Sequence, residues 1–311
     1  MTIQSPPRWA IRSDTIIVCL LLFCAGNTAA QSLEPRAYAD TPVGLNFLVA
    51  GYAYSEGDVL PDPALPLEEA NISIDALVAA YVRTLALGNR AAKFEVIAPW
   101  ATASGTATYA GEPASREVSG FGDPRLRLSV NLFGDSARTL PQFIKKGQRP
   151  VVGASLAVTL PAGQYDNDKV VNIGTNRWSV KGELGVSKPF GKITTELAAA
   201  VTVFGDNDEF LVTNVREQAP LYSLQMHLIY EFRPALWGAV SGTWYHGGRT
   251  TVSGVRGNDL QDNFRAGAAL AVPLNKRNSL KFYADTGVST RIGGDFNTVG
   301  IAWQHRWGAA L

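Results

Sequence analysis

Few side chains in this sequence combine a type and a spacing that could perform catalysis. Its three histidines, His227, His246 and His305, are the natural candidates for a general base. A serine two residues from a histidine would share its face of a strand and could act as a nucleophile, but none of the three histidines has one. We therefore predict no catalytic residues, and we expect His227 to form hydrogen bonds inside the molecule.

Two acidic runs offer oxygen atoms to a metal ion, Asp166-Asn167-Asp168 and Asp206-Asn207-Asp208-Glu209. Neither continues with the glycine and the distal glutamate of a calcium-binding loop. We predict solvated turns, and weak contact with the divalent ions of a lipopolysaccharide surface is the alternative. Both cysteines lie in a segment that we expect to be removed, which leaves no thiolate ligand. The sequence thus predicts no metal and no cofactor.

Charged residues recur instead at alternate positions of apolar segments. Between 125 and 132, Arg125 and Arg127 alternate with leucines and a valine, and this pattern returns in 177–187, 192–203, 221–232, 263–272 and 279–288. A period of two residues predicts strands with one polar and one apolar face. Strands of about 9–11 residues with this alternation are typical of membrane-spanning β-barrels. Reversing the faces would place arginines in lipid, at roughly 2–4 kcal/mol each near the bilayer midplane.

Weaker alternation completes a set of about twelve strands, near 44–54, 72–86, 92–101, 151–160, 236–246 and 297–307. The faces of 44–54 and 236–246 stay unassigned. Short links at 87–91, 188–192, 233–235 and 273–278 alternate with longer polar links at 55–71, 102–122, 161–176, 205–220 and 247–262. Outer-membrane barrels show this asymmetry, with short turns on the periplasmic side. Only the links at 134–149 and 291–295 depart from it.

The predicted fold class is therefore all-β, an outer-membrane antiparallel β-barrel of about twelve strands. The last strand agrees, because Trp303, His305 and Trp307 repeat at period two, as in the C-terminal signal by which bacterial barrels are recognised for insertion. After residue 30, no segment approaches about 18 consecutive apolar residues, which excludes spanning helices. A soluble β-sandwich is the alternative, since alternation alone cannot distinguish lipid from a protein core.

The N-terminal residues predict secretion. Arg8 and Arg12 precede an apolar run at 15–23, and small residues lead to Thr28-Ala29-Ala30. This pattern is typical of a cleaved signal peptide over 1–30, followed by a single barrel domain over 31–311. A buried N-terminal helix is the alternative. The remaining chain carries 26 basic and 26 acidic residues (28 minus 2 and 27 minus 1), a balance that argues against a nucleic-acid partner.

Inward-facing charges are the main functional clue. Parity assigns nine basic side chains to the lumen against six acidic ones, namely Arg83, Lys93, Arg125, Arg127, Arg177, Lys181, Arg265, Lys281 and Arg306 against Asp75, Glu95, Glu183, Glu196, Glu231 and Asp285. The pore-lining candidates are Arg125, Arg127, Arg177, Lys181, Glu183, Glu196, His227, Glu231, Arg265, Lys281 and Asp285. Such a wall would favour small anions, because lining charge sets selectivity in channels. The alternative is a network of ion pairs that fills a closed barrel.

Two segments could affect access to the lumen. The link at 134–150 carries Phe143-Ile144-Lys145-Lys146 and is predicted as a long periplasmic-side loop, with a partial plug as the alternative. The stretch at 31–43, before the first strand, is too short for a full plug domain.

Several motifs resemble those of one family. They are Gly122-Asp123-Pro124-Arg125-Leu126-Arg127-Leu128-Ser129-Val130-Asn131-Leu132, Pro161-Ala162-Gly163-Gln164-Tyr165, Asn176-Arg177-Trp178-Ser179, Gly247-Gly248-Arg249-Thr250-Thr251 and Gly287-Val288-Ser289-Thr290-Arg291. Together they resemble the MetA-like outer-membrane transporters associated with the meta-pathway of phenol degradation, over nearly all of the chain after residue 30. The resemblance implies passage of aromatic compounds and names no binding residue.

Three classes of function follow. The first, which we favour, is an outer-membrane channel or transporter through which small aromatic or anionic solutes diffuse passively. The second is a barrel with a closed lumen that acts in structure or through its outer loops. The third is a membrane-embedded lipid hydrolase, for which the sequence offers no catalytic set, so we predict that the protein is not an enzyme. The expected partners are outer-membrane lipids and lipopolysaccharide, the barrel-assembly machinery and a small-molecule solute.

Overall fold

The computed structural model describes residues 34–60, 67–109, 111–134, 137–146, 148–169 and 171–308. The predicted signal peptide lies outside these residues and stays a prediction. Within them, regular structure is almost entirely strand. None of the helices among these residues has the length and apolar character needed to cross a membrane.

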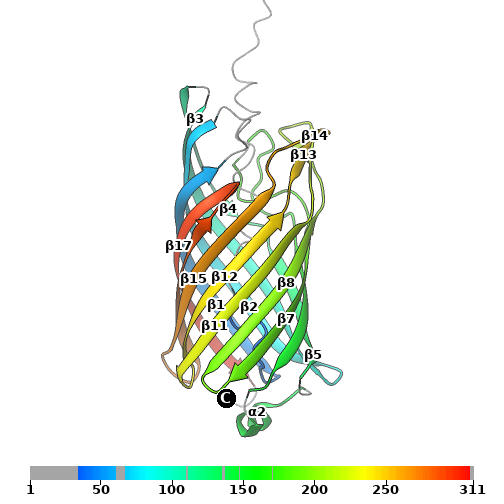
Figure 1. The fold of residues 1–311 in the computed structure, drawn as a ribbon, viewed down its shortest axis with the longest axis vertical. Helices are drawn as coiled ribbons and strands as arrows, with labels where there is room; N and C mark the ends of the chain where they lie inside the picture. The colour runs from blue at the N-terminus through cyan, green and yellow to red at the C-terminus, as the bar shows by residue number, and fades with distance from the viewer. Residues whose placement is uncertain are drawn as a thin grey trace, which may run out of the picture.

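Twelve antiparallel strands close into a barrel, which confirms the predicted fold class (Figure 1). The first strand, β1 (Leu45–Leu60), pairs along its whole length with the last, β17 (Gly293–Gly308). The ten strands between them are β2 (Leu67–Leu87), β3 (Arg90–Tyr109), β5 (Arg125–Phe133), β6 (Val151–Thr159), β7 (Ser179–Phe190), β8 (Ile193–Phe204), β11 (Leu221–Arg233), β12 (Leu236–Gly247), β15 (Gln261–Pro273) and β16 (Asn278–Ser289). Closure removes the sheet edges, and a sheet in lipid requires this because no water is there to satisfy unpaired backbone groups.

Side chains alternate between lipid and lumen along the strands. On β11, Met226 is 54% exposed while His227 next to it is buried. The same alternation assigns the two strands whose faces the sequence left open. On β12, Thr243 is buried inside and Trp244 is exposed outside, and on β1 the odd-numbered positions face inward.

The structure corrects the parity of β2. Thr84 is the buried, inward position, so Arg83 and Asp75 face outward rather than into the lumen. Asp75 accepts a hydrogen bond from Tyr52, and Arg83 lies near the periplasmic end of its strand, opposite Asn46. Charge facing outward costs little near the membrane interfaces. The sequence predicted the wrong face because the inward face of this strand carries alanine, isoleucine and valine, whereas the outward face carries most of its polar residues.

The strands at the outer end are longer than the sequence suggested. Beyond the part of β3 that pairs with β5, β3 pairs with β4 (Glu112–Phe121). The prediction of a loop at 102–122 is therefore wrong, because most of this segment forms a β-hairpin. Likewise β1 and β2 extend into the predicted link at 55–71. These extensions enclose an apolar cluster of their own, which includes Val59, Ile72, Ala103 and Val118. Because they rise above the barrel rim (Figure 1), they need a core of their own rather than a lipid-facing surface.

A second, smaller sheet lies at the same end of the barrel (Figure 1). It consists of β9 (Asn207–Phe210), β10 (Asn214–Gln218), β13 (Thr250–Val252) and β14 (Val255–Arg256), so the predicted loops at 205–220 and 247–262 carry short strands. The opposite end holds tight turns. Gly191, between β7 and β8, has a φ of +61°, a left-handed conformation that glycine adopts without strain. We assign this end to the periplasm, as short turns indicate.

The long link between β5 and β6 contains the helix α2 (Leu140–Lys146). It lies below the barrel at the periplasmic end (Figure 1). It therefore does not fill the lumen.

Candidate functional site in the barrel lumen

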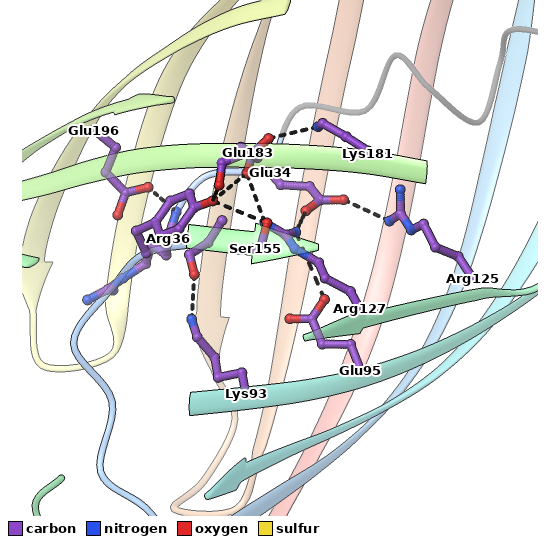
Figure 2. A network of polar contacts seen from close by, with 12 residues as sticks. Glu34, Arg36, Lys93, Glu95, Arg125, Arg127, Ser155, Lys181, Glu183 and Glu196 are labelled. Carbon is purple, nitrogen blue, oxygen red and sulfur yellow. Dashed lines mark hydrogen bonds and ion pairs between the residues drawn. The ribbon is translucent and has the colours of Figure 1, made fainter. Parts of the chain in front are cut away.

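The lumen is crossed by the residues that precede β1. We call residues 34–44 the N-terminal segment. Its backbone and side chains bond to β3, β5, β6, β7 and β8 from within (Figure 2). At its end the segment joins the wall, where the Gly44 amide donates to the Thr84 carbonyl (3.0 Å). A partial plug formed by 134–150 was the alternative to the predicted periplasmic-side loop, and the structure places 34–44 in the lumen instead.

Tyr38 anchors the middle of the segment in a slot made by two glycines. Gly153 on β6 and Gly185 on β7 are paired, and a Cβ built on either would lie 2.6 or 2.2 Å from a carbon of the Tyr38 ring. The phenol donates to a Glu183 carboxylate oxygen (2.9 Å) and lies 3.2 Å from the Ser155 hydroxyl. Burial, and then the charge of Glu183, raises the pKa of Tyr38, so the phenol remains a donor at neutral pH.

Glu34 lies against two neighbouring arginines of β5. One carboxylate oxygen accepts from Arg125 (2.9 Å) and the other from Arg127 (2.5 Å), so each arginine binds one oxygen. Arg127 is also paired with Glu183 (3.0 Å) and lies 3.9 Å from Glu95. A buried guanidinium needs partners that compensate for its lost hydration, and Arg127 has three carboxylates around it.

The remaining wall charges near the segment also have ion-pair or hydrogen-bond partners. Lys181 bonds to Glu183 (2.8 Å), and Lys93 donates to the Ala37 carbonyl. Glu196 accepts from the Arg36 amide (2.7 Å) and from the Ser187 hydroxyl (2.9 Å).

The side chain of Arg36 reaches the strands beyond β8. Its guanidinium lies over the Trp237 ring, 5.3 Å from the centroid, and interacts electrostatically with Glu231. The N-terminal segment is thereby tied to β12 as well as to the wall shown in Figure 2.

Farther round the barrel, the lumen charges form separate pairs. Arg265 donates to the Asp285 carboxylate and to the Phe296 carbonyl (2.8 Å). Lys281 lies over the Tyr283 ring at 5.5 Å. Both groups are on inward positions, so they contribute to the potential inside the barrel.

His227 and Ser241 lie opposite each other on β11 and β12, with 2.7 Å between Nδ1 and Oγ. The two residues are far apart in the sequence, so local spacing could not reveal this pair. Among the described residues, none hydrogen-bonds to the other ring nitrogen of His227. This contact is the internal hydrogen bond that the sequence predicts for His227.

Most of the pore-lining candidates thus meet in one region, although their role in a pore remains a prediction. Arg125, Arg127, Lys181, Glu183 and Glu196 surround the N-terminal segment, with Glu231 close to Arg36. His227, Arg265, Lys281 and Asp285 lie on other strands of the wall, and Arg177 lies at the outer mouth.

Sequence reasoning missed Glu34, Arg36 and Tyr38, because they precede the first strand and follow no alternation. The one available signal was the glycine at inward positions 153 and 185, which leaves room for a ring. Correcting β2 removes one basic and one acidic residue from the lumen set, which leaves eight against five and the same surplus of three.

A family model described as "Putative MetA-pathway of phenol degradation" matches residues 53–299. The chain belongs to this family. It is similar in structure to the COG4313 outer membrane channel from Pseudomonas putida F1, with a TM-score of 0.76 and 18% identity over 89% of this chain and 100% of that one. It is also similar to the β domain of the Bordetella autotransporter BrkA, with a TM-score of 0.51 and 13% identity over 84% and 98%. No curated protein matches the sequence. The shared fold is that of an outer-membrane β-barrel.

The motifs that resemble this family lie together at the outer mouth of the barrel. Asp123 accepts from the Gly163 amide (2.9 Å) and from the Thr175 amide (2.8 Å) and hydroxyl (2.6 Å). These bonds tie the segment 160–178 to the break between β4 and β5. Arg177, which is 4% exposed, donates to Gln218, and the Gln218 side chain donates in turn to the Gly248 carbonyl (2.8 Å).

The two predicted acidic turns lie near this mouth. The run at 206–209 enters β9, where the Asn176 side chain donates to Glu209 (3.3 Å), and the run at 166–168 makes ordinary ion pairs. Asp166 is 3.6 Å from Arg116, and Asp168 is 2.7 Å from Lys169. Among the described residues there is no cluster of three or more histidine, cysteine or carboxylate side chains arranged for a metal.

Proposed function

We propose that this outer-membrane barrel is a channel through which small aromatic or anionic solutes diffuse passively. The observation that carries the proposal is the interior of the closed barrel, which is lined by charged side chains with a surplus of basic ones. The family description refers to phenol degradation, and the similar Pseudomonas putida protein is titled a channel. An aromatic carboxylate combines both properties and suits this wall.

The chemistry of the wall supports a solute path more than a structural filling. Replacing buried ion pairs by apolar side chains of similar size is often neutral or stabilising, by about 1–4 kcal/mol. A barrel that needed only to be filled would gain little from Arg127 with its three carboxylates. Charges that line a pore, by contrast, select the ions that pass.

The N-terminal segment supports the second candidate, a barrel with a closed lumen. It bridges opposite parts of the wall through Glu34, Arg36 and Tyr38. For solutes to pass, they must move beside the segment or displace it.

Conductance of the purified full chain in planar bilayers tests the choice between the two. Our proposal predicts stepwise currents, together with swelling of protein-loaded liposomes in aromatic acids that exceeds swelling in sugars of similar size. Neutral aromatic solutes separate the effect of the ring from the effect of the negative charge, because a channel that selects only for anions would exclude neutral aromatics. A silent bilayer and no swelling in any solute would establish the closed-lumen barrel.

The same proposal includes the parts of the biogenesis that the sequence predicts. Residues 1–30 would be cleaved, and the barrel-assembly machinery would recognise the aromatic last strand. Outer-membrane lipids and lipopolysaccharide would then surround the apolar band. Trp303, His305 and Trp307 stack on each other along its lower rim, at centroid distances of 5.9 and 5.7 Å, as in the aromatic girdles of such barrels.

A further inference from the structure

The carboxylate of Glu34 is held in the lumen as a bound ligand would be. Its two oxygens are divided between two arginines on successive inward positions of β5 (Figure 2). Arginine guanidinium groups bind carboxylates through charge-assisted hydrogen bonds, which are about twice as strong as neutral ones. The ligand in this case comes from the chain itself, 91 and 93 residues away in sequence.

The wall around this contact carries one positive charge more than its own carboxylates balance. Lys93, Arg125, Arg127 and Lys181 are four cations, and Glu95, Glu183 and Glu196 are three anions. Glu34 supplies the fourth negative charge. In addition, Glu34 interacts electrostatically with Lys281 from across the barrel. Without Glu34, the wall would hold a cationic site open to any carboxylate in the lumen.

Arg125 has bonding capacity beyond Glu34. Within the part of the chain that the structure describes, Glu34 is the carboxylate paired with Arg125, and the Nε of Arg125 is buried with no acceptor. Arg127, by contrast, keeps Glu95 and Glu183 when Glu34 leaves. Arg125 is therefore the residue whose partner a solute would replace, and Arg127 holds the second oxygen.

We propose that Arg125 and Arg127 form a binding site for the carboxylate of a solute, and that Glu34 occupies this site as an internal competitor. The inference rests on the proposed channel function and assigns its specificity site. A solute carboxylate that replaces Glu34 between the arginines frees the start of the N-terminal segment. Binding and opening of the path are then one event, and a neutral solute cannot trigger it.

The competition sets a concentration scale. A side chain tethered next to its site acts at an effective concentration on the order of millimolar. A simple carboxylate must therefore reach roughly millimolar concentrations to displace Glu34, unless further contacts strengthen its binding. The apparent affinity for the solute equals its intrinsic affinity multiplied by the fraction of time for which Glu34 leaves the site free.

The test is a ¹⁹F NMR titration of the full chain in detergent with 4-fluorobenzoate, and with neutral 4-fluorobenzamide as the probe of micelle partitioning. Glu34→Gln should bind 4-fluorobenzoate about fivefold or more tightly than the wild type, because the competitor is lost. Adding Arg125→Gln to Glu34→Gln should weaken that binding at least about tenfold, since charge-assisted bonds are removed. The benzamide should not distinguish the variants.

Asp40→Asn is the matched control for loosening of the segment. Asp40 pairs with Arg138 at the other end of the segment, so its loss removes an anchor and leaves Glu34 on the arginines. Equal gains in Asp40→Asn and Glu34→Gln would overturn the proposal, and so would equal affinity in Glu34→Gln and the wild type. Tight benzoate binding by Glu34→Gln without any conductance would support the site and refute the channel. Conductance without such binding would support the channel and refute the site.

Discussion

The slot that holds Tyr38 shows how single residues of the wall decide which side chains fit in the lumen. The ring fits because positions 153 and 185 lack a Cβ. Alanine at position 185 would overlap the ring, and a side chain can leave its slot more easily than the paired strands can separate. The wall should therefore survive the substitution while the N-terminal segment is released.

We expect Gly185→Ala to expose the bond after Arg36 to trypsin, with cleavage at least about tenfold faster than in the wild type, since overpacking costs typically 1–3 kcal/mol. Intact mass spectrometry of the folded protein in detergent measures the cleavage. Gly182→Ala on the same strand is the control, because a Cβ there meets nothing within 4 Å. Rapid cleavage in Gly182→Ala as well would attribute the effect to the strand rather than to the slot.

At the scale of elements, the sequence predicted the strands that lie in lipid and misjudged those outside it. Arg125 and Arg127 could be assigned to the lumen because lipid excludes charge from the other face. The same rule gives no signal at 102–109, where β3 leaves the membrane: threonine and serine on one face alternate with alanine and glycine on the other, and large apolar residues are missing from most positions of both. Neither face of that stretch meets lipid, so its small and polar residues predict a loop. The site residues of 34–44 were not predicted for a related reason, because an irregular segment has no hydrophobic period that a sequence can reveal.

Asp123, between β4 and β5, holds the irregular segment 160–178 through hydrogen bonds, and its removal should loosen that segment. Asp123→Ala deletes the acceptor of three hydrogen bonds from Gly163 and Thr175, and bonds to a charged group contribute about 1.5–3 kcal/mol each. We expect hydrogen–deuterium exchange to accelerate across 160–178 and to stay unchanged in β6 and β7. Asp208→Ala, on an exposed position of β9, is the control. Unchanged exchange in 160–178 would mean that its apolar contacts suffice to hold it.

At the scale of the whole molecule, twelve strands make the wall and the eleven residues of the N-terminal segment lie against its inner face. Deletion of 34–40 should leave the barrel folded, because no wall strand pairs with the segment in the sheet. Conductance in planar bilayers should rise severalfold, since both Glu34 and Tyr38 are removed. Heat-modifiable migration on gels verifies the fold of the deletion variant. Equal conductance with and without the segment would show that solutes already pass beside it.

The charge of the lumen makes a prediction that depends on the salt concentration. The wall carries eight basic against five acidic inward residues, and Arg36 and Glu34 add one of each, so the lumen should give a reversal potential of anionic sign under a KCl gradient. The preference should shrink from 0.1 to 1 M salt, because the Debye length falls from about 10 Å to about 3 Å. Lys281→Gln should reduce it further, whereas Lys188→Gln, on the exposed face of β7, should not. A cationic reversal potential, or one that ignores Lys281, would show that the ion pairs neutralise the wall locally and that its net charge does not act on the permeating ion.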